Sequence, residues 1–224
     1  MGNPRLFEKF TEVVHQQGYS TISLLLPGHG GSVKEFASST LEQWQGHVDS
    51  EIQRFSRDYP NIRLVGHSMG GLLALNAAAR LNEQVSGVFV IASPLKLAVA
   101  PAKANISRMK YLFYRKTHPK KVAFLANTGI RFSPNVILRI IKPFMELEKL
   151  MHATKGILPS VRAPVTAVYS LSDELTSIKS LEILESGLNG APFEKLLLSD
   201  SLHAYFPANE RAEIDQALVR MLER

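Results

Sequence analysis

The chain has 224 residues and no cysteine, which excludes disulfides, thiolate metal sites and a cysteine nucleophile. Its hydrophobic share of 45%, charged share of 21% and net charge of +6 are compatible with one ordinary globular domain. No apolar run approaches the roughly 20 residues of a membrane-spanning helix, and Arg5, Glu8 and Lys9 interrupt any secretory signal. The sequence therefore predicts a cytoplasmic protein.

Helices and strands are predicted to alternate along the first 94 residues. An apolar stripe at helical spacing predicts a helix over residues 4–17, which Gly18 ends. The run 19–27 predicts a buried strand, and a Gly-rich loop follows it. Ser39 and Glu42 have the spacing of a capping box at the start of a second helix. The next elements are expected to be a strand at 61–66, a helix at 69–81 and a strand at 85–93.

The middle of the chain, residues 95–157, has a different character. Between Pro94 and Met145 there are eleven Lys or Arg residues and no Asp or Glu, and prolines divide the segment into short helical pieces. We expect it to form a helical cap, inserted into a core made of residues 1–94 and 158–224. After it, strands are predicted at 163–171 and 193–199 and helices at 177–187 and 209–223. This alternation predicts an α/β fold, a mostly parallel sheet of about five strands with helices on both faces.

The pentapeptide Gly66-His67-Ser68-Met69-Gly70 has the G-x-S-x-G pattern and lies between a predicted strand and a predicted helix. So tight a turn strains the backbone of its serine, and we expect side chains larger than hydrogen at the flanking glycines to collide. The helix that begins at Met69 offers unpaired N–H groups to a developing negative charge. The alternative is a Gly-rich loop that only packs against the sheet. The strand–turn–helix context favours Ser68 as a nucleophile.

A serine nucleophile needs a base and an acid that orients the base. Asp173 follows a late predicted strand, with Glu174 beside it as the second choice of acid. His203 follows the last predicted strand, so the three residues stand in the order serine, acid, histidine that this arrangement requires. His29 and His67 are candidates for contact with the substrate, and packing and support of the turn are their alternative roles.

Other site chemistries have little support in the sequence. No histidine pair has metal-ligand spacing and no Gly-rich dinucleotide fingerprint occurs, so neither a metal nor a cofactor is expected. Aromatic and aliphatic residues are interleaved with the basic residues of the middle segment, which suits contact with an anionic lipid surface; a solvated helical face is the alternative. No recognised module supports nucleic-acid binding, and the oligomeric state is left open.

Four stretches together resemble the α/β-hydrolase superfamily, near bacterial carboxylesterases and monoacylglycerol-lipase-like enzymes. The resemblance implies that Ser68 is the nucleophile, Asp173 the acid and His203 the base, with the Met69 N–H as one oxyanion donor. It also implies a serine hydrolase that cleaves carboxylic esters, with lipid-like acyl esters such as monoacylglycerols as the favoured substrates. The stretches are LLLPGHGGS, VGHSMGG, APVTAVYSLSDELT and SDSLHAYF.

The chain departs from the superfamily pattern at its start. In the superfamily, an apolar strand ending in a His-Gly-aromatic motif precedes the first helix and supplies a second oxyanion N–H. The sequence from Met1 to Pro4 resembles the residues that follow this motif. Because that strand is an interior one, we expect its two neighbours to lack hydrogen-bond partners and the oxyanion hole to be incomplete. Either Met1 is an internal residue of a longer reading frame, or the fold is rearranged and the chain is a non-catalytic binding protein.

Overall fold

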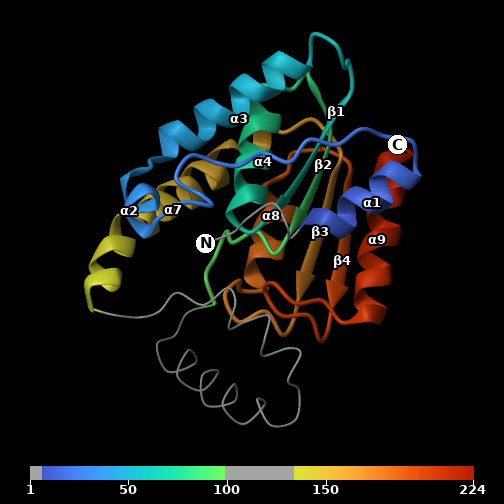
Figure 1. Cartoon of the computed structure of the whole chain (residues 1–224). Coiled ribbons are helices and arrows are strands. Elements are labelled where there is room, and N and C mark those ends of the chain that lie inside the picture. The colour runs from blue at the N-terminus through green and yellow to red at the C-terminus, as the bar shows by residue number, and fades with distance from the viewer. Residues whose placement is uncertain (1–6, 99–133) are drawn as a thin grey trace.

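The computed structural model describes residues 7–98 and 134–224, and its centre is a parallel β-sheet (Figure 1). Four strands lie in the order β1-β2-β3-β4, and each pairs in parallel with the next. This arrangement confirms the predicted α/β class. The strands are β1 (Ile62–His67), β2 (Val85–Ile91), β3 (Val165–Ser170) and β4 (Phe193–Leu198).

Helices cover both faces of the sheet, as Figure 1 shows. The pleat of each strand turns alternate residues to opposite faces, so that Val88 and Val90 join one apolar cluster while Phe89 and Ile91 join another. The first cluster packs against α3, α4, α7 and α8, and the second against α1 and α9. The helices are α1 (Glu8–Gln16), α2 (Val33–Ser38), α3 (Leu41–Phe55), α4 (Met69–Arg80), α7 (Pro134–Ile157), α8 (Lys179–Gly187) and α9 (Ala208–Leu222), with a short 3-10 helix, η2, at Leu158–Ser160.

The start of α3 corrects one detail of the sequence prediction. The capping box there is formed by Thr40 and Gln43, one residue later than the predicted pair Ser39 and Glu42. Thr40 has an extended backbone and its side chain accepts the Gln43 N–H, whereas the Ser39 hydroxyl donates to the Phe36 carbonyl at the end of α2. Both pairs have the same spacing in the sequence, so only the backbone conformation distinguishes them.

The predicted strand at 19–27 is not formed, so the described sheet has four strands and not five. Within the described part of the chain, β1 pairs only with β2. No described strand pairs with residues 19–27 to supply their hydrogen bonds. Ile22 and Leu25 are about half exposed (53% and 51%), contrary to the predicted burial.

The predicted cap falls largely outside the described residues, because 99–133 and their basic side chains are not among them. The last turns of α7 pack into the core, where Leu150 and Met151 are buried beside α4. At the start of α3, the buried carboxylate of Glu146 accepts the Leu41 N–H at 2.9 Å. The division of the chain into core and cap stays a prediction. Among the described helices, none has the length and apolarity needed to cross a membrane.

Candidate active site

Ser68 occupies a sharp turn between β1 and α4. Its φ of 54° lies in the left-handed region that residues other than glycine rarely adopt. A Cβ at Gly66 would come within 2.4 Å of the Gly70 carbonyl oxygen, and one at Gly71 would come within 1.8 Å of the Ser93 hydroxyl. Gly70 has nothing within 4 Å of its Cβ position, so the predicted collision is wrong at that glycine. Close packing at Gly66 and Gly71 therefore holds the turn.

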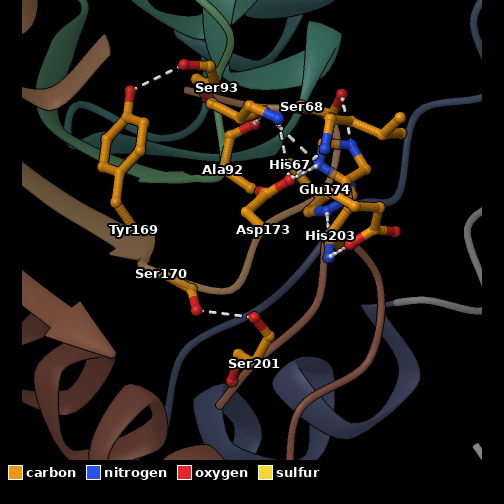
Figure 2. Close-up of polar contacts among 12 residues, drawn as sticks. His67, Ser68, Ala92, Ser93, Tyr169, Ser170, Asp173, Glu174, Ser201 and His203 are labelled. Carbon is orange, nitrogen blue, oxygen red and sulfur yellow. Dashed lines mark hydrogen bonds and ion pairs between the residues drawn. The ribbon is translucent and has the colours of Figure 1, made fainter. Parts of the chain in front are cut away.

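The structure brings Ser68, His203 and Asp173 together at the carboxyl edge of the sheet, on the loops that follow β1, β4 and β3 (Figure 2). His203 Nε2 lies 2.9 Å from Ser68 Oγ, and His203 Nδ1 lies 3.1 Å from Asp173 Oδ2. A carboxylate only accepts hydrogen bonds, so Nδ1 carries the proton and Nε2 is free to accept the serine hydroxyl. This geometry allows general-base activation of the hydroxyl.

Asp173 is fixed by the turn that contains it. Its Oδ1 accepts the backbone N–H groups of Leu175 and Thr176, both at 2.8 Å, and its side chain is only 2% exposed. The Thr176 hydroxyl donates to the Ala92 carbonyl at 3.0 Å, which ties this turn to the end of β2. The Asp173 carboxylate thus accepts three N–H groups, two from the backbone of its own turn and one from the His203 ring, and these bonds fix its orientation.

The loop that carries His203 is held by a carboxylate that the sequence analysis did not identify. Glu210, in the first turn of α9, accepts the N–H groups of Ser199 and Asp200 at 2.8 Å and the hydroxyl of Ser201. Burial acts to raise the pKa of Glu210, but these hydrogen bonds outweigh it and lower the pKa. From β3, the Ser170 hydroxyl donates to the Ser201 carbonyl at 2.6 Å (Figure 2). Nothing in the spacing of these residues signals their contact.

His67 lies against His203, with their ring centroids 4.9 Å apart. Its Nε2 is 2.6 Å from the His203 carbonyl oxygen, so this nitrogen carries a proton and donates it. Burial and the nearby His203 imidazole lower the pKa of His67 to about 4. His67 is therefore neutral at neutral pH.

The second choice of acid, Glu174, contacts the main chain of His203. Its Oε2 accepts the His203 N–H at 3.0 Å, whereas both oxygens of Asp173 face the imidazole. Geometry therefore favours Asp173 over Glu174 as the partner of the ring.

His29 lies in an aromatic group, edge-on to Phe36 at 5.0 Å and to Trp44 at 5.9 Å between centroids. Burial lowers its pKa, and its Nδ1 is 3.3 Å from the Pro27 carbonyl. These contacts suit the packing role, and a role for His29 in substrate binding stays a prediction. Within residues 7–98 and 134–224, no three His, Asp or Glu side chains are grouped so that they could hold a metal ion.

A family model described as "Serine aminopeptidase, S33" (Hydrolase_4) matches residues 4–206. The chain belongs to this family. A curated relative, a thermostable monoacylglycerol lipase from Bacillus sp. (strain H-257), is 21% identical over 203 residues, which are 90% of this chain and 78% of the relative.

Solved structures confirm the α/β-hydrolase fold. A structure of the metagenome-derived lipolytic enzymes LipS and LipT superposes with a TM-score of 0.75 at 19% identity, covering 100% of this chain and 90% of that one. A soluble variant of monoglyceride lipase from Saccharomyces cerevisiae, in complex with a substrate analog, gives a TM-score of 0.73 at 15% identity, covering 99% and 83%. These neighbours have lipolytic activities, and the fold of this chain is theirs.

Proposed function

We propose that this protein is a serine hydrolase that cleaves carboxylic esters through an acyl-enzyme at Ser68. The observation that carries the proposal is the 2.9 Å contact from His203 Nε2 to Ser68 Oγ, on a turn that holds Ser68 at a φ of 54°. The fold, the family and the lipolytic relatives support the same reaction class.

The reaction proceeds in two halves. Ser68 Oγ attacks the ester carbonyl carbon while its proton passes to His203 Nε2, and Asp173 stabilises the imidazolium. The N–H of Met69, the first residue of α4, stabilises the oxyanion. When the carbon–oxygen bond to the alcohol breaks, His203 returns the proton to the leaving alcohol. Water then attacks the acyl-enzyme and gives its proton to His203. When the bond from the acyl carbon to Ser68 Oγ breaks, His203 passes this proton to Oγ, and the acid is released.

Lipid-like acyl esters, such as monoacylglycerols, are the proposed substrate class. The support comes from the named activity of the monoacylglycerol lipase relatives and from the apolar character of the middle segment. A series of nitrophenyl esters of increasing acyl length, followed by monoacylglycerols, tests this class. Because the family description names an aminopeptidase, an amino-acyl anilide belongs in the same panel. Faster turnover of the anilide than of every ester would contradict the ester assignment.

The test of the mechanism is Ser68→Ala. We expect ester turnover to fall by on the order of 10,000-fold or more, because the histidine and aspartate contribute little without the hydroxyl. Full activity in Ser68→Ala would contradict the proposal. A matched control is Ser50→Ala, an exposed serine on α3, which should retain turnover.

We further propose that the protein contacts anionic lipid through the region around the N-terminal half of α7. There, Ile141, Phe144 and Met145 are 49%, 47% and 53% exposed, and Lys142 lies among them. An apolar stripe with adjacent basic charge suits an anionic interface. Sedimentation with anionic and neutral liposomes tests this contact. Phe144→Ser should weaken anionic binding, whereas Leu197→Ser, an equally exposed position on β4, should not. Equal pelleting with both liposomes would contradict the proposal.

A further inference from the structure

The main chain of His203 is held on both sides by side chains. Glu174 Oε2 accepts its N–H at 3.0 Å, and His67 Nε2 donates to its carbonyl at 2.6 Å (Figure 2). Glu174 follows Asp173 and His67 precedes Ser68. The two segments that carry the acid and the serine therefore also bind the peptide groups of the same histidine.

The position of the imidazole depends on this main chain. The distance from Nε2 to Ser68 Oγ is 2.9 Å, and a displacement of about 1 Å would take it beyond hydrogen-bond range. Misplacement of a reacting group by about that amount can cost up to roughly 100-fold in rate. Side chains that fix the peptide groups of His203 consequently affect catalysis without touching substrate.

The two holding groups differ in a way that suits their places. Glu174 carries a carboxylate, which makes the bond to the N–H a charge-assisted one. His67 is neutral, because burial and the adjacent imidazole lower its pKa to about 4. The His203 ring, 4.9 Å away, becomes an imidazolium during the reaction. Because the His67 ring is neutral, it can donate to the His203 carbonyl without repelling that positive charge.

We propose that Glu174 and His67 are positioning residues that hold the peptide groups of His203 and thereby keep its imidazole in contact with Ser68. This inference rests on the proposed serine-hydrolase function. Asp173 orients the ring of His203, and Glu174 and His67 fix the point from which the ring extends.

Two pairs of variants test the proposal. Glu174→Ala removes the acceptor, whereas Glu174→Gln keeps an amide oxygen that can accept the N–H. His67→Phe keeps a ring but removes the donor, whereas His67→Gln places an amide N–H at a similar reach. Two readouts are measured for each variant. One is kcat and KM for a nitrophenyl ester, and the other is the rate at which a fluorophosphonate labels Ser68, with Ser68 Oγ forming a bond to phosphorus as fluoride leaves.

We expect Glu174→Ala and His67→Phe to lower kcat and the labelling rate by about tenfold with KM unchanged. The Gln variants should recover most of both rates. Glu185→Ala, which removes a carboxylate from an exposed ion pair with Lys195, should leave both rates unchanged. Melting temperatures identify any loss that comes from unfolding, and if Glu174→Ala fails to fold, the two His67 variants decide the question.

Three results would overturn the inference. The first is an unchanged labelling rate in Glu174→Ala and His67→Phe. The second is a Gln variant that loses as much rate as the Ala or Phe variant at the same position. The third is a raised KM with an unchanged kcat. If the wild type reacts with the fluorophosphonate but with no ester, the ester proposal fails while the labelling rates still test the positioning role. A wild type that reacts with neither overturns both.

Discussion

Ser68 and His203 are held in place by different physical means. The turn around Ser68 depends on the absence of side chains, because Gly66 and Gly71 lie where a Cβ would meet backbone or the Ser93 hydroxyl. The loop of His203 depends on the presence of side chains, because Glu210, Glu174 and His67 bind its peptide groups. The first region is determined by excluded volume and the second by hydrogen bonds between distant parts of the chain.

The two regions should therefore fail differently when mutated. Excluded volume acts over fractions of an ångström and cannot be relieved where the obstacle is backbone. A hydrogen-bonded loop has several ties, so the loss of one leaves the others in place. We expect a single substitution at the turn to cause a large loss of stability and turnover, and a single substitution in the loop to cause a partial loss.

The largest effect is expected from Gly66→Ala. The added methyl group would lie 2.4 Å from the Gly70 carbonyl oxygen and 2.5 Å from the Gly71 Cα, so the turn must move. We expect a loss of about 3 kcal/mol in the free energy of unfolding and a loss of ester turnover in the variant that folds. Denaturant unfolding and the nitrophenyl assay measure the two. Gly70→Ala, with nothing within 4 Å of its Cβ position, is the matched control and should fold like wild type. Equal stability of both variants would refute the steric account.

Glu210→Ala tests the hydrogen-bonded loop. It leaves the N–H groups of Ser199 and Asp200 without their acceptor. Because both residues are exposed to water, the cost is about 1 kcal/mol for each lost hydrogen bond. We expect a lower free energy of unfolding and a partial loss of turnover, which is smaller than that of Gly66→Ala. Glu213→Ala, an exposed glutamate on the same helix, is the control and should be near neutral. An unaltered unfolding curve for Glu210→Ala would show that the loop is held by other contacts.

Acidification tests His67. Its pKa is lowered from 6.5 to about 4 in the folded protein, so below 6.5 the unfolded chain binds more protons than the native one. Stability is therefore lost as the pH falls from about 6.5 toward 4, and at about pH 5 the loss from this group is at most about 2 kcal/mol. A plot of the free energy of unfolding against pH has an acid limb, the part in which stability falls as the pH falls. In His67→Gln, the contribution of this group to the acid limb should disappear. His152→Gln, at an exposed position, should leave the limb as it is, and a limb unchanged in His67→Gln would contradict the assignment.

The smallest effect is expected from Ser170→Ala, which removes one tie between β3 and the loop of His203. The lost hydrogen bond to the Ser201 carbonyl is worth about 1 kcal/mol. Chemical denaturation should show this decrease, with turnover within a few-fold of wild type. A decrease as large as that of Glu210→Ala would mean that the ties do not act separately.

The same contrast explains what the sequence could predict. Much of the turn at Ser68 depends on neighbours within five residues, so the G-x-S-x-G pattern between strand and helix indicated it. The freedom at Gly70 and the close approach of the Ser93 hydroxyl to Gly71 were missed. The order of Ser68, Asp173 and His203 along the chain predicted that they would meet, and the structure places them within hydrogen-bond distance. Their roles are part of the proposed function.

The parts that the sequence did not predict depend on contacts between residues that are distant in the sequence. Glu210 resembles an ordinary surface glutamate in the sequence, and Glu174 was singled out only as the second choice of acid. Their contacts with the loop of His203 exist only after β3 and β4 pair. The strand predicted at 19–27 has a suitable apolar composition, but a strand needs a neighbour, and composition does not show whether one is present. The capping box was placed one residue early because Ser39 and Thr40 offer the same side-chain chemistry.

The strand β2 lies between the strand that leads to Ser68 and the strand that leads to Asp173, and hydrogen bonds set each spacing. Serine and acid are therefore separated by two strand spacings, roughly 10 Å, a gap that one imidazole spans. Beyond Ile91, the carbonyls of Ala92 and Ser93 at the carboxyl end of β2 accept the hydroxyls of Thr176 and Tyr169. New sequence can enter the chain after this strand without changing the gap. The distance between serine and acid is thus set by the pairing of β1, β2 and β3, and not by the segment that follows β2 in the sequence.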